Sequence, residues 1–284
     1  HQFLLIDNFL TQRYCSLFDL PKNVSYKFIE IDVSSFQIDD YFKDVDIVIH
    51  LAAITDAANS FNNSEEVERN NLQATGNVAK ACLNNGSKLI FLSSTSVYGT
   101  ANKVIDENCS KDELKPQSPY AETKLKEEEL INNLENQGLK FICCRFGTIF
   151  GASQGMRFHT AVNKFCWQAV MGTEITVWET AYEQSRPYLD LKDASNSFEH
   201  IINKDLFSGE TYNILTQNAT VKEVIDIIKD EIPNLKISFV KNKIMNQMSY
   251  EVMSQKFVSE GFKFKGGLKR GILETIDVLR NSNN

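Results

Sequence analysis

The chain lacks the features that mark membrane-spanning, secreted and nucleic-acid-binding proteins. No apolar run approaches the roughly 20 residues needed to cross a bilayer, and the N-terminus has neither the basic start nor the apolar segment of a signal peptide. Lysine and arginine form no basic block, and the net charge is -7, which argues against a nucleic-acid partner. These absences predict a cytoplasmic protein.

The cysteines show no metal-ligand spacing, so no metal site is predicted. They occupy positions 15, 82, 109, 143, 144 and 166. Cys143 and Cys144 lie in an apolar run typical of a strand, where neighbouring side chains point to opposite faces. We expect reduced thiols that serve as small core residues.

What the chain does have is an alternation of strand and helix signals. This alternation predicts an α/β fold, with a parallel sheet that carries helices on both faces. Strands are expected at 3–6, 26–31, 45–53, 88–93, 139–145 and 188–191. Helices are expected at 36–43, 65–83, 119–137 and 193–202, the second ending before Gly86 and the third before Gly138.

Beyond Gly147 the alternation becomes irregular, which predicts a smaller second lobe. Residues 1–147 and 187–204 are assigned to the sheet domain, and residues 148–186 and 205–284 to the lobe.

Tyr120 and Lys124 are spaced by one helical turn and would share a helix face. A free phenol titrates near 10, and lowering its pKa by about three units takes roughly 4 kcal/mol. A neighbouring ammonium in a partly dry pocket can supply that. The pair therefore suggests hydride-transfer chemistry, although a lone Tyr-x-x-x-Lys also occurs on solvated helix faces.

Five segments occur in the order and rough spacing of one enzyme family. They are Val48-Ile49-His50-Leu51-Ala52-Ala53, Asn71-Leu72, Leu92-Ser93-Ser94-Thr95-Ser96-Val97-Tyr98-Gly99, Tyr120-Ala121-Glu122-Thr123-Lys124 and Arg186-Pro187-Tyr188-Leu189-Asp190-Leu191-Lys192-Asp193. The chain resembles the extended short-chain dehydrogenase/reductases, and among them the NAD-dependent nucleotide-sugar epimerases and dehydratases of the UDP-glucose 4-epimerase type. This resemblance implies a doubly wound, Rossmann-like sheet.

One part of the family pattern has no counterpart here. The family opens with a strand and a glycine-rich turn that receives the pyrophosphate at a helix N-terminus. No such turn precedes Phe3, and the chain starts with His1 at what resembles the family's second strand. The sequence is therefore expected to lack roughly thirty residues of the pattern.

The resemblance implies a set of NAD-binding residues. Asp7, with Asn8, ends the first strand, where an acid accepts hydrogen bonds from the adenosine ribose and disfavours NADP. A turn is the alternative for this pair. The remaining candidates are Asp32, Val33, Leu51, Ala52, Ala53, Asn71, Tyr120 and Lys124. For Asp32 a helix cap, and for Asn71 a helix-surface amide, are the alternatives.

The resemblance also assigns the catalytic and substrate-binding groups. Ser94 would hydrogen-bond the reacting sugar oxygen, Tyr120 would exchange a proton with it, and Lys124 would hold the nicotinamide ribose. Thr95 is the reserve hydroxyl. Arg186 would clamp the nucleotide diphosphate. Thr148, Arg157, Asn163, Trp178 and Tyr250 would line the sugar-nucleotide cleft, or else belong to the lobe's core or surface. His50 is interpreted as a buried core histidine and His159 as a cleft wall.

The reaction itself stays open. Dehydratases of the family usually carry an acidic pair where this chain has Thr95-Ser96, so a 4,6-dehydratase is disfavoured. A C4 epimerase and a sugar dehydrogenase or reductase both fit, with the base and the sugar unidentified. The alternatives are an NAD(P)-dependent reductase of a non-sugar ketone and a non-catalytic NAD-binding module. The family also implies a homodimer built on a four-helix bundle of helices 65–83 and 118–137.

Overall fold

A computed structural model describes residues 1–35, 37–99, 104–241 and 249–281. The strands are β1 (Gln2–Asp7), β2 (Ser25–Glu30), β3 (Ile47–His50), β4 (Lys88–Ser94), β5 (Val104–Ile105), β6 (Phe141–Phe146), β7 (Thr148–Phe150), β8 (Ile175–Trp178), β9 (Ser185–Asp190), β10 (Thr211–Ile214), β11 (Gln217–Thr220), β12 (Ile237–Val240) and β13 (Glu251–Val252). The α-helices are α1 (Ser64–Asn85), α2 (Pro119–Glu135), α3 (Ala161–Val170), α4 (Leu191–Lys204), α5 (Val221–Glu231), α6 (Gln255–Ser259) and α7 (Leu268–Asn281).

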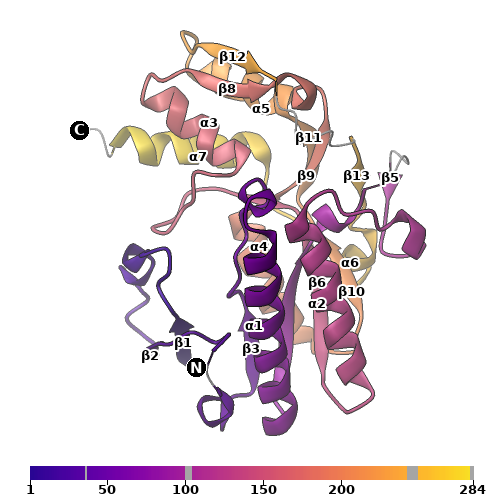
Figure 1. The fold of residues 1–284 in the computed structure, drawn as a ribbon. Coiled ribbons are helices and arrows are strands. Elements are labelled where there is room, and N and C mark those ends of the chain that lie inside the picture. Colours follow the sequence, from indigo (N-terminus) through magenta and orange to yellow (C-terminus); the bar gives the residue numbers. More distant parts are fainter. Residues whose placement is uncertain (36, 100–103, 242–248, 282–284) are drawn as a thin grey trace.

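The centre of the molecule is a parallel sheet in the order β10-β6-β4-β3. Helices cover both of its faces, as the alternation of elements predicts (Figure 1). Cys143 packs with Val78 of α1 in the core on one face. Its neighbour Cys144 packs with Ile201 of α4 on the other face. The two thiols therefore point to opposite faces, and all six cysteines are free.

The two helices beside the sheet begin and end where local signals predict. Ser118 caps α2 by accepting a hydrogen bond from the Ala121 backbone N–H at 3.2 Å, and Pro119 occupies the first turn. Gly86 ends α1 with a φ of 73°, a left-handed conformation that glycine adopts without strain.

Two predicted elements are shorter than expected. Residues 36–43 were expected to form a helix, but the described part is a single 3₁₀ turn, Asp39–Phe42, flanked by the buried Ile38. The strand expected at 45–53 ends at His50 because the chain turns away. The backbone of Ile54 then pairs with the Asn71 side chain and leaves the strand ladder.

β1 and β2 form a parallel pair of their own. Figure 1 shows this pair to one side of α1 and β3. Among the described residues β3 pairs with β4 alone, so it is an edge of the central sheet. Leu51, just beyond β3, is 59% exposed.

The second lobe holds the order β11-β9-β7 and the pair β12-β8, packed against α3, α5 and α7. Its boundary differs from the predicted one in two places. β10, expected in the lobe, pairs with β6 of the central sheet, and Phe257 of α6 packs beside it. Conversely, β9 pairs with strands of the lobe. No helix in the described ranges has the length and apolar content needed to cross a membrane.

Candidate active site

A cavity opens at the carboxyl ends of β3, β4 and β6, the edge where parallel sheets place their ligands. It measures about 650 Å³, which is within the usual range for ligand sites. His50, Leu51 and Ala53 line it after β3, and Ser93, Ser94 and Ser96 line it after β4. Residues 146–151, which include β7, form a further wall.

The three predicted catalytic residues meet in this cavity. Ser94 ends β4, while Tyr120 and Lys124 occupy the first turns of α2, and all three line the same space. The Ser94 hydroxyl lies near the Tyr120 phenol and acts to lower its pKa, against burial, which raises it. Ser94 Oγ also accepts from the backbone N–H of Ser96 at 3.1 Å, which fixes the hydroxyl at the cavity wall.

Burial raises the pKa of Tyr120, although Lys124 acts in the opposite direction. This differs from the lowered pKa that the Tyr-x-x-x-Lys spacing alone suggests. The sequence did not reveal that the tyrosine is partly buried, nor that Glu127 lies beside the lysine. Burial would lower the pKa of Lys124, but Glu127 together with Tyr120 more than offsets it, so the net shift is upward.

His50 is a buried histidine with a partner, as predicted. Its Nε2 lies 3.0 Å from the Thr75 hydroxyl. Burial, together with the Lys124 charge, lowers its pKa to about 3, so the ring is neutral. The ring also borders the cavity, and His159 forms another part of its wall.

The predicted cofactor residues fall into two groups. Leu51, Ala53, Tyr120 and Lys124 line the cavity. Asp7, Asn8, Asp32, Val33, Ala52 and Asn71 do not border it. Asp7 and Asp32 end or follow β1 and β2, where each carboxylate accepts a local backbone N–H, from Phe9 at 2.6 Å and from Ser34 at 2.8 Å. The Ser34 hydroxyl, ahead of the backbone bond, lowers the pKa of Asp32.

Asn71 is fully buried and its amide is used within the protein. It accepts from the Ile54 backbone N–H at 2.8 Å and donates to the Ile54 carbonyl at 3.0 Å. The side chain therefore holds the segment that follows β3, directly behind the cavity wall.

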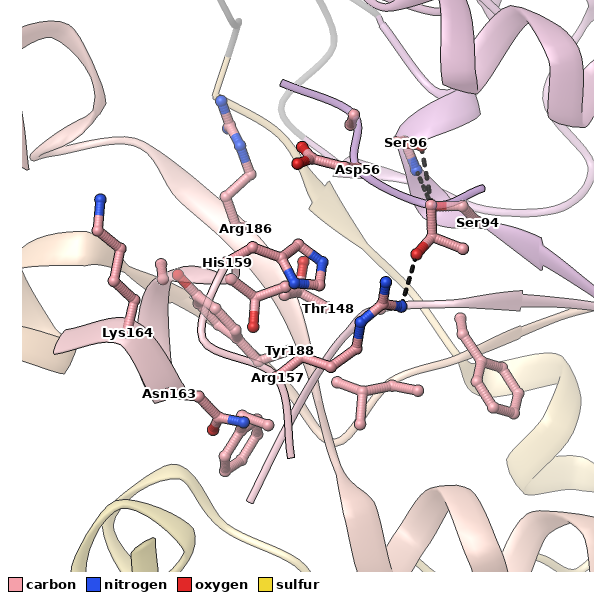
Figure 2. Close-up of a pocket in the computed structure, with 18 of the residues that line it drawn as sticks. Asp56, Ser94, Ser96, Thr148, Arg157, His159, Asn163, Lys164, Arg186 and Tyr188 are labelled. Atoms are coloured by element: carbon pink, nitrogen blue, oxygen red, sulfur yellow. Dashed lines mark hydrogen bonds between the residues drawn. The ribbon is translucent and has the colours of Figure 1, made fainter. Parts of the chain in front are cut away.

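Five of the residues predicted on the substrate side line the cavity: Thr148, Arg157, Asn163, Trp178 and Arg186. Figure 2 shows most of them around one space, with Ser94 and Ser96 on one side and Asn163 and Lys164 on the other. Thr95 and Tyr250 lie behind the wall, where the Tyr250 hydroxyl donates to the Thr95 carbonyl at 3.2 Å. Tyr250 also stacks under the Arg186 guanidinium, 5.3 Å from the ring centroid.

Arg157 is half-buried and incompletely satisfied. Its Nη1 donates to the Thr55 hydroxyl at 2.7 Å, whereas its Nε has no hydrogen-bond partner in the described part of the chain. Burial, followed by the nearby Arg13, lowers its pKa. A guanidinium in this state favours an anion from outside the protein.

The sequence analysis missed two charged residues of the cavity, Asp56 and Lys164. Asp56 follows the Leu51–Ala53 segment closely, and Lys164 is the neighbour of Asn163, so proximity to those candidates was the available signal. With them, the described wall carries Lys124, Arg157, Lys164 and Arg186 against the single acid Asp56. No group of His, Cys, Asp and Glu within the described ranges could hold a metal ion.

Fold and cavity together define a Rossmann-like protein with a Ser, Tyr and Lys group at the carboxyl edge of its sheet. Residues 6–214, more than half of the chain, match the model of the NAD dependent epimerase/dehydratase family. The chain belongs to this family, which confirms the prediction from sequence.

Relatives include both dehydratases and epimerases. A trifunctional UDP-glucose 4,6-dehydratase/UDP-4-keto-6-deoxy-D-glucose 3,5-epimerase/UDP-4-keto-L-rhamnose-reductase of Arabidopsis thaliana is 29% identical over 93% of this chain and 41% of its own length. This chain thus spans about two-fifths of that relative. A putative UDP-glucose 4-epimerase of Methanocaldococcus jannaschii is 26% identical over 100% of this chain and 92% of its own.

Solved structures confirm the predicted fold. A UDP-glucose 4-epimerase from Thermus thermophilus in complex with NAD has a TM-score of 0.82 at 22% identity and covers 98% of this chain and 91% of its own. A dTDP-glucose 4,6-dehydratase from Streptomyces venezuelae with NAD bound has a TM-score of 0.87 at 17% identity, covering 99% and 88%.

Proposed function

We propose that the protein is an NAD-dependent enzyme that transfers a hydride at a ring carbinol of a nucleotide-diphosphate sugar. The observation that carries this proposal is that Ser94, Tyr120 and Lys124 meet in one cavity of a member of this family. The same residues would be needless in a module that only binds a dinucleotide.

The described residues fit the nicotinamide end of NAD. The exposed Leu51 and the small Ala53 leave one cavity wall open to a planar ring, beside the Lys124 ammonium. Asp7 would receive the adenosine ribose, because the parallel strand β1 ends there with an acceptor side chain. NAD, when bound, supplies a cationic ring that accepts and returns a hydride.

Tyr120 would exchange a proton with the sugar hydroxyl that becomes a carbonyl. The Ser94 hydroxyl, held by the Ser96 backbone, would hydrogen-bond the same oxygen and orient it toward the phenol. Lys124 lies on the same helix face and would orient the nicotinamide ribose through its ammonium.

The charges of the cavity support an anionic substrate. The chain as a whole is acidic, with a net charge of -7, yet the described wall carries four cations and one acid. Arg157 has an unsatisfied Nε, and Arg186 is fixed by donating to the Ser185 carbonyl at 2.7 Å. A diphosphate is suited to such planar donors.

Dehydratases of the family usually carry an acidic pair at the position where this chain has Thr95 and Ser96. This difference supports epimerisation or a net redox reaction. Thr95 is buried and donates to the Phe146 carbonyl at 3.2 Å, while the Ser96 hydroxyl donates to Ser94. Neither side chain can act as an acid and base pair for elimination of water.

The test is to screen the purified protein with UDP-, dTDP- and GDP-sugars in the presence of NAD. We expect one sugar class to give NADH formation or exchange of the carbinol hydrogen, and mass spectrometry measures the exchange. Tyr120→Phe serves as the control, and equal behaviour of the two proteins across the screen would reject the proposal.

We also propose a cytoplasmic homodimer in which α1 and α2 pack against their copies. These helices lie side by side and are joined by the Lys126 and Glu68 ion pair at 2.6 Å (Figure 1). Analytical ultracentrifugation checks the dimer, and a charged substitution of the partly buried Leu72 should dissociate it.

A further inference from the structure

Glu127 is a buried acid that the proposed reaction does not use. It lies on α2, one turn after Lys124, and its side chain is 0% exposed. Its Oε2 is 3.1 Å from the Lys124 Nζ. Apart from this ion pair, Oε2 has no hydrogen-bond partner in the described part of the chain.

The other carboxylate oxygen is held by a relay from two further elements. Thr75 of α1 donates its hydroxyl hydrogen to Glu127 Oε1, and the Thr75 oxygen lies 3.0 Å from His50 Nε2 of β3. Because the Thr75 hydrogen is already used, the hydroxyl oxygen accepts from a neutral His50 that carries its proton on Nε2. Oε1 also accepts from the Lys124 Nζ at 3.4 Å, so the relay fixes the carboxylate with both of its oxygens toward the lysine.

The Lys124 ammonium consequently has two neighbours that compete for its charge. Glu127 is in contact with it, whereas the Tyr120 ring centroid lies 5.9 Å from Nζ. A cation already paired with a carboxylate stabilises a second anion less. We propose that Glu127 is a positioning residue that holds Lys124 and thereby weakens the effect of the lysine charge on the Tyr120 phenol. This inference rests on the proposed function.

The other titratable groups described around Lys124 and Tyr120 do not supply the negative charge that Glu127 supplies. His50 of β3 is neutral, and burial raises the pKa of the Cys143 thiol on β6, so it is neutral too. Arg157 approaches Tyr120 from the loop before α3 as a second cation. Glu128 turns to β6 and pairs with Arg145. Among the described groups that face Lys124 and Tyr120, Glu127 is the anion.

The test is a titration of Tyr120 that requires no substrate. The ultraviolet difference between the full-length protein and Tyr120→Phe isolates one phenol among nine tyrosines. We expect the Tyr120 pKa to lie above the ordinary value of about 10. In Glu127→Gln it should fall by at least about one unit. Thr75→Val, which releases the relay, should give a smaller fall.

Glu129→Gln is the matched control, because it removes the same charge from an exposed site on the same helix and should leave the titration unchanged. A Tyr120 pKa that is equal in Glu127→Gln and Glu129→Gln would overturn the proposal and leave Glu127 as a structural ion pair. If Glu127→Gln fails to fold by circular dichroism, Glu127→Met takes its place.

If neither variant folds, Thr75→Val decides, and a Tyr120 pKa equal to the wild-type value in that variant would contradict the proposal. An inactive sugar screen would reject the function without moving any of these titrations. If the function holds, the rising limb of the pH profile for sugar oxidation should shift to lower pH in Glu127→Gln, in step with the phenol.

Discussion

Two neighbouring glutamates of α2 reach two regions of the molecule and are bonded differently. Glu128 enters the core beneath the cavity and forms a two-pronged pair with Arg145, at 2.9 and 2.6 Å, and it also accepts from Ser93. Glu127 lies beside Lys124 and contacts its Nζ through both oxygens, at 3.1 and 3.4 Å, but Oε2 lacks a hydrogen bond in the described part of the chain. Complete bonding fits a structural role, and incomplete bonding fits a pair whose cation has a second task.

The largest expected effect that separates the two regions is on catalysis. Tyr120→Phe removes the proton that the phenol would exchange and should reduce sugar turnover by about 10²- to 10⁴-fold. Urea unfolding should change little, because the ring stays in place. A variant that loses turnover and stability together would place Tyr120 with the structural region instead.

Arg145→Met should have the opposite profile. It leaves Glu128 buried without its cation, which typically costs about 3–5 kcal/mol. Urea denaturation measures this loss of unfolding free energy. Glu128→Gln with Arg145→Met, which removes both charges, should recover part of it. An unchanged midpoint in Arg145→Met would show that the core does not depend on the pair.

Acidic pH should lower the free energy of unfolding through His50, which lies at the cavity. Its pKa is lowered to about 3 in the folded protein, so its contribution is fully present above about 6.5 and is lost as the pH falls toward 3. Between pH 7 and pH 5 the wild type should lose about 2 kcal/mol more than His50→Gln. Urea unfolding at both pH values provides the comparison, and equal losses would refute a neutral buried ring.

The smallest effect is expected at the substrate wall. Arg157→Met should raise KM for the active nucleotide sugar about tenfold, equivalent to about 1.4 kcal/mol, with kcat largely retained. Steady-state kinetics measure it, and Arg280→Met, on α7, is the control. A fall in kcat at constant KM would instead assign Arg157 to the chemical step.

Part of the site could be predicted from the sequence, namely the residues whose positions follow from local spacing or from the family motifs. The Tyr120 and Lys124 spacing places those two side chains on one helix face. Ser94 was assigned through the family resemblance, with Thr95 as the reserve. Glu127 was not predictable in this way. It belongs to the charged run 122–129, which has the composition of a solvated helix face. Its burial depends on the tertiary packing of α2, where the Thr75 hydroxyl of α1 donates to its carboxylate.

The fold shows the same limit. Strand and helix alternation predicts the central sheet, since each element carries its own pattern. The chain's return through β10 to pair with β6 depends on contacts between residues far apart in sequence, so the predicted lobe boundary included this strand. Likewise the residues expected as a helix at 36–43 bury Ile38 and Phe42 with a single 3₁₀ turn.

The opposite orientations of Cys143 and Cys144 have a practical use. Each thiol is covered by a different layer of helices, and burial raises the pKa of both, so neither reacts while its layer is closed. Single-cysteine variants of the protein can be labelled under native conditions. The thiol with the faster labelling rate would identify the helical layer that opens more readily by local unfolding.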